Sequence, residues 1–413
     1  MTSPATSDTS SLSSYQKRLF VFLGVATFFE GYDFIAISQI LPNLRASMEL
    51  SKSAGATLVA VINAGTILSY VLVRQSDRWG RRRVLTLTIA GYTISSFASG
   101  LATGPVSFAI AQFTARVFLI AEWAVSMVYA AEEFPAAKRG LVIGVIQAMS
   151  SLGSVVCAGM VPMLLATPLG WRSVYFVGTI PLVLLAFARR NLRESSRFAE
   201  VAAAQPAEHR PLLEILRGPY RGRVLELALI WGLTYVCTQS AVTFWKEFAL
   251  AERHFTDAQG GASITIAALA AMPLAFASGK LIDVLGRRGG GAIIFVLTSV
   301  GVFLTYTLPD RASLTAALAI TIFGASAVLP VLNAYTAELF PTELRGDAFA
   351  WSNNLLGRIG YVLGPLAVGW AAEYVGWGPA AAATAVFPLL ALGFILWLLP
   401  ETSGRELEET AGL

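Results

Sequence analysis

Two carboxylates lie three residues apart inside an apolar run of the chain. Glu30 and Asp33 belong to the stretch EGYD at 30–33, within the apolar run 20–41. At that spacing both side chains share one face of a helix. Burial in hydrocarbon disfavours the anion, so a carboxyl at this depth can load and release a proton when water reaches it from alternate sides. We expect proton transfer through Asp33, with Glu30 as a second carrier or supporting neighbour. The alternative is a structural carboxylate paired with a neighbouring helix.

Another apolar run contains an arginine and a glutamate. Glu122 lies seven residues before Tyr129 and therefore on the same helical stripe, where it could relay protons. A spacing of six does not put Glu122 and Arg116 on one helical face, so a partner for either must come from elsewhere. Arg116 is either a gate or substrate residue or a member of an interior ion pair.

Arg358 is the residue that we expect to contact substrate. Its guanidinium presents a planar fork that suits a carboxylate. Asn354 lies four residues before it and Tyr361 three after it, so both share its helical face. The alternative is pairing with Asp33 or Glu122, because buried charges need partners. Weaker candidates are polar side chains that could equally join helices, namely Asn63, Gln147, Gln239, Asn333 and Asn353.

Aromatic residues near helix ends are a further weak group. Trp231, Tyr235 and Trp245 could stack on a substrate ring. Aromatic residues in such places are more often anchors at the membrane surface, and we favour that role for them. All three remain weak candidates for binding.

The composition predicts a polytopic membrane protein. Of the 413 residues, 55% are hydrophobic and 14% charged, and the mean hydropathy is +0.63. Such a chain is too apolar for a soluble globule and too long for a single anchor. Both cysteines, Cys157 and Cys237, fall in apolar runs and both histidines in expected loops, so no metal cluster is expected. The sequence contains no GxxxxGK[ST] loop for a nucleotide. We expect no cofactor and no enzymatic chemistry.

Apolar runs of about 20 residues predict an all-α fold with twelve transmembrane helices. The expected spans are 19–41, 54–73, 84–103, 106–131, 140–165, 172–188, 224–249, 260–282, 290–308, 312–336, 347–372 and 378–399. They form two six-helix bundles, 19–188 and 224–399, joined by a cytoplasmic linker at 189–223. A disordered N-terminus, 1–18, and a tail, 400–413, complete the chain, and both are expected in the cytoplasm.

The distribution of basic residues gives the orientation. With both termini inside, the inner segments hold 22 Lys and Arg and the outer loops hold six, which fits the excess of basic residues in cytoplasmic loops. The six outer residues are Arg45, Lys52, Arg172, Lys246, Arg253 and Arg311. The net charge of +4 therefore reflects topology and does not indicate nucleic acid. We expect a monomer in a bacterial inner membrane, with the lipid bilayer, protons and a small-molecule substrate as partners.

An internal repeat relates the two halves. The stretch DRWGRR at 77–82 recurs as DVLGRR at 283–288, and EEFPAAKRG at 132–140 recurs as ELFPTELRG at 338–346, both 206 residues later. Since six spans separate the copies, the repeat is parallel, with its axis along the membrane normal. The same offset pairs Asp33 with Gln239, so the acid is peculiar to the first half. It also pairs Gln147 with Asn353.

At these residues the chain resembles the major facilitator superfamily. The stretch GKLID at 279–283 with GRR at 286–288 is similar to that family's loop motif, whereas the first copy has Val73 in place of the leading Gly. A carboxylate and arginines at facing helix ends can hold one gate state closed, and the alternative is ordinary positive-inside charge. The expected gate residues are Asp77, Arg78, Arg81, Glu132, Arg139, Asp283, Arg287, Glu338 and Arg345.

Local motifs resemble particular branches of the superfamily. The tail PETSGR at 400–405 is similar to the PETKGR of sugar porters, but the seventh span lacks the doubled Gln that sugar porters use. The EGYD stretch resembles the DGYD of aromatic-acid:proton symporters, which also have an arginine in the eleventh helix. Glu122-Trp123 resembles the GEW of organic-acid porters. That match puts Gln112 where relatives have an arginine, whereas a match on Arg116 displaces Glu122.

The resemblance implies alternating access between two bundles. We expect a proton-coupled symporter of a small organic anion, a carboxylate, with aromatic acids among the options. The same fold could instead serve a sugar or polyol:proton symporter, a proton-driven exporter of hydrophobic compounds, or a receptor without turnover.

Overall fold

The first half of the chain is a set of six helices. The computed structural model describes residues 12–188, 193–194, 213–341 and 343–403. The six helices are α1 (Ser14–Ser47), α2 (Lys52–Trp79), α3 (Arg81–Gly100), α4 (Pro105–Glu133), α5 (Ala136–Leu165) and α6 (Arg172–Ala188). α1 begins five residues before the expected span, at a capping box formed by Ser13 and Gln16.

The second half is also helical but more interrupted. Its first part is α8 (Glu214–Arg217), α9 (Arg221–Thr243), α10 (Trp245–Arg253), α11 (Asp257–Val284), α12 (Gly286–Thr307) and α13 (Arg311–Glu338). Its eleventh-span region is α14 (Arg345–Phe349), a π-helical segment (Ala350–Gly357) and α15 (Ile359–Val375). The last part is α16 (Trp377–Ala382), a 3₁₀ turn (Ala383–Ala385) and α17 (Val386–Leu398).

Three of the predicted spans differ from the structure. The helix expected at 224–249 ends at Thr243, and α10 starts as a separate helix. The expected spans 347–372 and 378–399 contain the π segment and the 3₁₀ turn. Ten helices among the described residues are long and apolar enough to cross a membrane; α3 is not one of them, and the apolar part of α6 is short. Most of the expected linker and tail lies outside the described residues.

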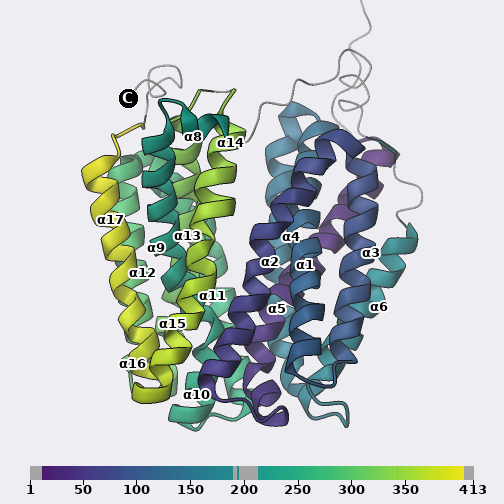
Figure 1. Cartoon of the computed structure of the whole chain (residues 1–413), viewed down its shortest axis with the longest axis vertical. Helices are drawn as coiled ribbons and strands as arrows, with labels where there is room; N and C mark the ends of the chain where they lie inside the picture. Colours follow the sequence, from purple (N-terminus) through teal and green to yellow (C-terminus); the bar gives the residue numbers. More distant parts are fainter. Residues whose placement is uncertain (1–11, 189–192, 195–212, 342, 404–413) are drawn as a thin grey trace, which may run out of the picture.

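The two sets of helices lie side by side (Figure 1). α1 to α6 occupy one side of the molecule and α9 to α17 the other, with α2 packed on α15 and α5 packed on α11. The start of α1 and the end of α17 lie at the same end of the molecule, which we call the terminal end. α10 and α16 lie at the opposite end (Figure 1).

Glycines let helices cross with their backbones in contact. A Cβ built on Gly31 of α1 would lie 1.9 Å from the carbonyl oxygen of Ser150, and one on Gly153 of α5 would lie 1.8 Å from that of Phe28. Small residues at such crossings allow close approach of membrane helices. The α1–α5 crossing thus places Glu30, the neighbour of Gly31, directly against α5.

We expect Gly153→Ala to destabilise the protein. The added methyl group meets backbone that cannot move away alone, and overpacking of this kind costs about 1–3 kcal/mol. Gly144→Ala in the same helix is the control, because a Cβ there meets nothing within 4 Å and helix propensity gains up to about 1 kcal/mol. Thermal unfolding in detergent measures both, and equal midpoints for the two variants would contradict the close crossing.

Candidate functional site

The first half places two carboxylates and an arginine in its interior. Glu30 and Asp33 on α1 are both buried, and the Glu30 carboxylate accepts a 2.7 Å hydrogen bond from the Ser150 hydroxyl on α5. Arg116 on α4 acts electrostatically on both carboxylates but forms no ion pair with either. Its guanidinium carbon lies 5.0 Å from the centroid of the Phe34 ring. Proton exchange at these acids would therefore change the charge balance around Arg116.

The guanidinium of Arg116 is incompletely satisfied. The side chain is 2% exposed, and its Nη1 has no acceptor among the described residues. A buried donor without an acceptor costs about 1–3 kcal/mol, and more when it is charged. Such a group is a candidate for binding an anion.

Arg358 lies at the end of the π-helical segment. Its backbone N–H donates to the Asn353 carbonyl at 3.0 Å, a bond that spans five residues. The side chain is 9% exposed, and its guanidinium carbon lies 5.6 Å from the centroid of the Tyr361 ring. Its Nε has no acceptor, and the described residues provide no ion-pair partner for it. The alternative pairing with Asp33 or Glu122 is therefore absent from this structure.

π-helical turns are frequent at functional sites. The π-helical turn before Arg358 was missed by the sequence reasoning, although two closely spaced glycines mark its end. Gly357 and Gly360 permit the near-contact with α9: a Cβ on Gly360 would lie 2.1 Å from the Gly232 carbonyl oxygen. The segment is thus held against α9 while its last turn sets the direction of Arg358.

Aromatic side chains surround Arg358 in the second half. The Tyr235 and Tyr361 rings meet edge to face at 4.7 Å, and the Tyr235 hydroxyl donates to Asn353 Oδ1 at 2.8 Å. Trp231 stacks against Tyr235, is fully buried and donates to the Thr336 hydroxyl. The expectation that Trp231 and Trp245 anchor at the membrane surface is wrong, because both indoles pack inside the protein.

Tyr361 links the two halves. Its carbonyl oxygen accepts a 3.1 Å hydrogen bond from the Asn63 amide on α2. Its phenol interacts electrostatically with Arg358 and, across the interface, with Arg116 and Glu30. The structure thus brings the buried charges of the first half and Arg358 together around one tyrosine.

Other predicted residues lie apart from this group. Glu122 accepts hydrogen bonds from Thr88 at 2.5 Å and Ser126 at 3.2 Å. Gln147 is exposed and accepts from the Trp123 indole.

The remaining neutral candidates have local roles or none. Gln239 donates to Thr243 one turn away, and Asn354 is half-buried. Gln112 is buried and donates to Ser99 at 2.9 Å. No group of three His, Cys, Asp or Glu side chains that could hold a metal occurs in the described part of the chain.

A cluster of ion pairs at the opposite end was missed by the sequence reasoning. Arg45 at the end of α1 pairs with Glu247 of α10 at 2.7 Å. Lys246, only 1% exposed, pairs with Asp257 at 2.7 Å and donates to the Gln39 carbonyl at 2.7 Å. The basic residues had been counted as outer-loop charge, whereas here they join the halves.

The same end has a second set of contacts between α2 and α15. Lys52 Nζ donates to the Ala372 carbonyl at 3.0 Å, and the Ser53 backbone N–H donates to the Glu373 carboxylate at 2.8 Å. Gly369 is packed so closely on Ala56 that a Cβ would lie 1.9 Å from that residue's own. Polar and apolar contacts thus close the interface at the opposite end.

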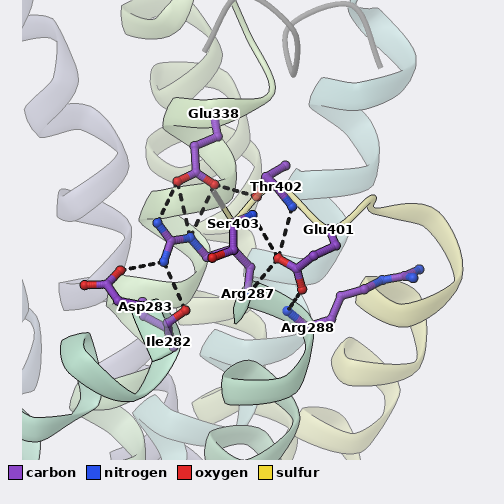
Figure 2. A network of polar contacts seen from close by, with 8 residues as sticks. All are labelled: Ile282, Asp283, Arg287, Arg288, Glu338, Glu401, Thr402 and Ser403. Atoms are coloured by element: carbon purple, nitrogen blue, oxygen red, sulfur yellow. Dashed lines mark hydrogen bonds and ion pairs between the residues drawn. The ribbon is translucent and has the colours of Figure 1, made fainter. Parts of the chain in front are cut away.

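At the terminal end, Figure 2 shows the polar network of the second half. Arg287 pairs with Glu338 at 2.9 Å and with Asp283 at 2.7 Å. The first half repeats the principal pair, with Arg81 and Glu132 at 3.1 Å. The two pairs occupy matching places in the repeat, and each lies within its own half.

Arg78 and Arg345, the other expected gate residues whose side chains are described, form no ion pair with another described residue. Arg78 is exposed, and Arg345 donates to the Phe340 carbonyl at 3.0 Å. The side chains of Asp77 and Arg139 lie outside the described part of the structure.

Glu401 of the tail caps α12. Its carboxylate accepts from the backbone N–H groups of Arg287 at 2.8 Å and Arg288 at 2.9 Å, which open the helix (Figure 2). Glu194 contacts the start of α3 in the same way, through the Arg82 N–H at 3.2 Å. First-turn N–H groups have no partner within their own helix and favour a negative charge. The PETSGR tail therefore has a structural role.

Comparison with known proteins identifies the family. The family model described as Major Facilitator Superfamily matches residues 23–289 and 227–412. The chain belongs to the major facilitator superfamily. It is a non-enzymatic transporter and a multi-pass membrane protein.

Relatives of this transporter are named for organic solutes. A protein of Cupriavidus pinatubonensis named as a "probable 4-methylmuconolactone transporter" is 28% identical over 410 residues, covering 96% of this chain and 93% of its own. A gallate transporter of Pseudomonas putida is 24% identical over 408 residues, covering 90% and 88%. The xylose transporter XylE of E. coli, in a partially occluded inward open conformation, matches with a TM-score of 0.77 at 19% identity, covering 95% and 100%.

We expect Glu247→Gln to open the opposite end of the transporter. The change leaves the Arg45 guanidinium without its counter-charge, and loss of one partner of a buried pair costs several kcal/mol. The population ratio of the two gate states should shift at least about tenfold. Distances between spin labels at Glu49→Cys and Ala251→Cys measure the opening. Glu226→Gln, which breaks an ion pair within α9, is the control and should leave the distances unchanged. An identical shift in both variants would show that the Arg45–Glu247 pair does not hold the opposite end closed.

We expect Glu401→Gln to lower stability in a pH-dependent way. Partial burial alone raises the pKa of the Glu401 carboxyl, but backbone N–H donors outweigh it and hold the pKa below its ordinary value. The stabilisation is therefore fully present at neutral pH and is lost as the pH falls through the lowered folded-state pKa. The variant should unfold about 1–2 °C lower at pH 7, a difference that shrinks in acid. Glu49→Gln, at an exposed site, is the control; a pH-independent difference would contradict capping by the carboxylate.

Proposed function

We propose that this transporter is a proton-coupled symporter of a small organic anion. The observation that supports it best is Arg358, a buried guanidinium with an unsatisfied N–H and no carboxylate partner among the described residues. A substrate carboxylate would satisfy this group with charge-assisted hydrogen bonds. The ring of Tyr361 lies beneath the guanidinium and helps to orient it.

Proton coupling is assigned to Asp33, with Glu30 as its adjunct. Both acids are buried within electrostatic range of Arg116. In the proposed cycle, Asp33 takes a proton on the outer side while the substrate carboxylate meets Arg358. Together these events remove the cost of carrying unpaired charge, and the two halves can then rock about the central site. Release of the proton and the substrate to the cytoplasm completes uptake.

The finer topology belongs to this proposal. We count twelve spans, including α3 and α6, in bundles 19–188 and 224–399. We place both termini in the cytoplasm of a cell with this protein in its inner membrane. The opposite end, which Arg45, Lys246 and their partners close, then lies on the outer side of the membrane. The structure is therefore assigned to the inward-facing state of the transport cycle. The protein is proposed to act as a monomer.

The names of two relatives support an organic acid as substrate. One is named for gallate, an aromatic carboxylate, and the other for 4-methylmuconolactone. The sugar or polyol alternative rested on the PETSGR tail. Since Glu401 of that tail caps α12, the motif is explained without reference to a sugar.

Uptake into proteoliposomes under an inward proton gradient tests the proposal. Benzoate or gallate should accumulate, and Asp33→Asn should abolish accumulation above equilibrium. Arg358→Gln should weaken uptake about 10–100-fold, since hydrogen bonds to charged groups contribute about 1.5–3 kcal/mol. Arg311→Gln at an exposed site is the matched control.

Other outcomes identify the alternatives. Accumulation of glucose or xylitol in place of the acids would overturn the proposal in favour of a sugar porter. Extrusion of hydrophobic dyes driven by protons would indicate an exporter. Binding without net transport would indicate a receptor.

A further inference from the structure

We propose that the substrate carries two carboxylates, one bound by Arg358 and the other by Arg116 across the interface between the halves. The proposal rests on the proposed function, because it assigns a substrate class to the same site. It differs in giving Arg116 a direct contact with substrate.

The first support is that both arginines are buried and lack an acceptor for one of their N–H groups. Arg116 is 2% exposed and Arg358 9% exposed, and each retains one buried N–H without an acceptor. Neither forms an ion pair within the described part of the chain. By contrast, Arg45, Arg81 and Arg287, near the two ends of the molecule, each have a carboxylate partner.

The second support is the position of the two guanidinium groups. Arg116 comes from α4 of the first half and lies over the Phe34 ring, whereas Arg358 comes from the second half and lies over the Tyr361 ring. Each is thus backed by a different aromatic face, which orients it separately.

Contacts of α2 place both arginines in one central region. The Asn63 amide donates to the Tyr361 carbonyl at 3.1 Å. A Cβ on Gly65, two residues further on, would lie 3.2 Å from the Cβ of Arg116. Two carboxylates on one small frame can meet both groups at once.

The third support is the charge balance. Glu30 and Asp33 are the acids that interact with Arg116. When protons neutralise them, the two arginines leave two positive charges in this region. A monocarboxylate compensates one of these charges and leaves the other buried, whereas a dicarboxylate compensates both. The protonated carrier is therefore matched to a dianion.

Binding of paired probes to the purified full-length chain tests this inference. Terephthalate and benzoate share a ring and differ by one carboxylate, and adipate and hexanoate are the corresponding flexible pair. At a pH where all four probes are ionised, calorimetry should show the diacid binding at least tenfold more tightly in at least one pair. Arg116→Gln should bring the ratio of diacid to monoacid affinity towards one. Arg358→Gln should weaken the binding of both members of each pair.

Controls separate charge from folding. Arg116→Lys keeps the positive charge and should retain a preference for the diacid, and Arg311→Gln should retain the full ratio. If Arg116→Gln does not fold, the ratio of diacid to monoacid affinity in the unaltered protein and in Arg116→Lys still decides whether the site prefers a dicarboxylate.

Two results would overturn the inference. If monoacids and diacids bind equally in both pairs and depend on Arg358, one carboxylate suffices; the dicarboxylate is then excluded and the proposed function stands. If a diacid preference survives Arg116→Gln unchanged, Arg116 is not its source. A failure of all four acids to bind would instead count against the proposed function itself.

Discussion

A charged side chain removed from water is costly unless a counter-charge meets it. The transporter obeys this constraint at both ends and departs from it in the middle. Arg45 pairs with Glu247 at the opposite end, and Arg287 pairs with Glu338 at the terminal end. In the centre, Arg116 and Arg358 retain donors without acceptors. Paired ends hold a conformation in place, whereas the centre retains N–H donors to which an acceptor can bind.

The sequence predicted the helical fold class and the internal repeat, and it placed Asp33, Arg116 and Arg358 within apolar spans, where the structure buries them. Apolar runs and basic loops depend on local composition, which a single sequence contains. Pairs such as Arg45 with Glu247 depend on segments about 200 residues apart meeting at one end, and no local pattern encodes that meeting. Their basic members therefore looked like topological charge. The burial of Trp231 was missed for the same reason, because its partners lie on other helices.

The PETSGR tail shows that a family motif can have a structural role that its sequence alone does not reveal. In the sequence it supported the sugar alternative. In the structure, Glu401 accepts N–H groups that open α12, and Thr402 donates to Glu338 at 2.5 Å (Figure 2). The tail therefore ties the last helix to the Arg287–Glu338 pair of its own half. Glu194 has the corresponding place in the first half, where its carboxylate accepts the Arg82 N–H at the start of α3.

The π-helical segment also changes how the two halves correspond. Before it, buried positions match at 206 residues, as Val142 matches Ala348; after it they match at 207, as Gly153 matches Gly360. The segment acts as a one-residue insertion in one of two related helices. In an α-helix one residue corresponds to about 100° of rotation. A gapless comparison would align Arg358 with Leu152, a residue on a different face of its helix. Arg358 thus lies where the twofold relation of the halves loses its register, so the helix of the first half has no basic residue at the corresponding position.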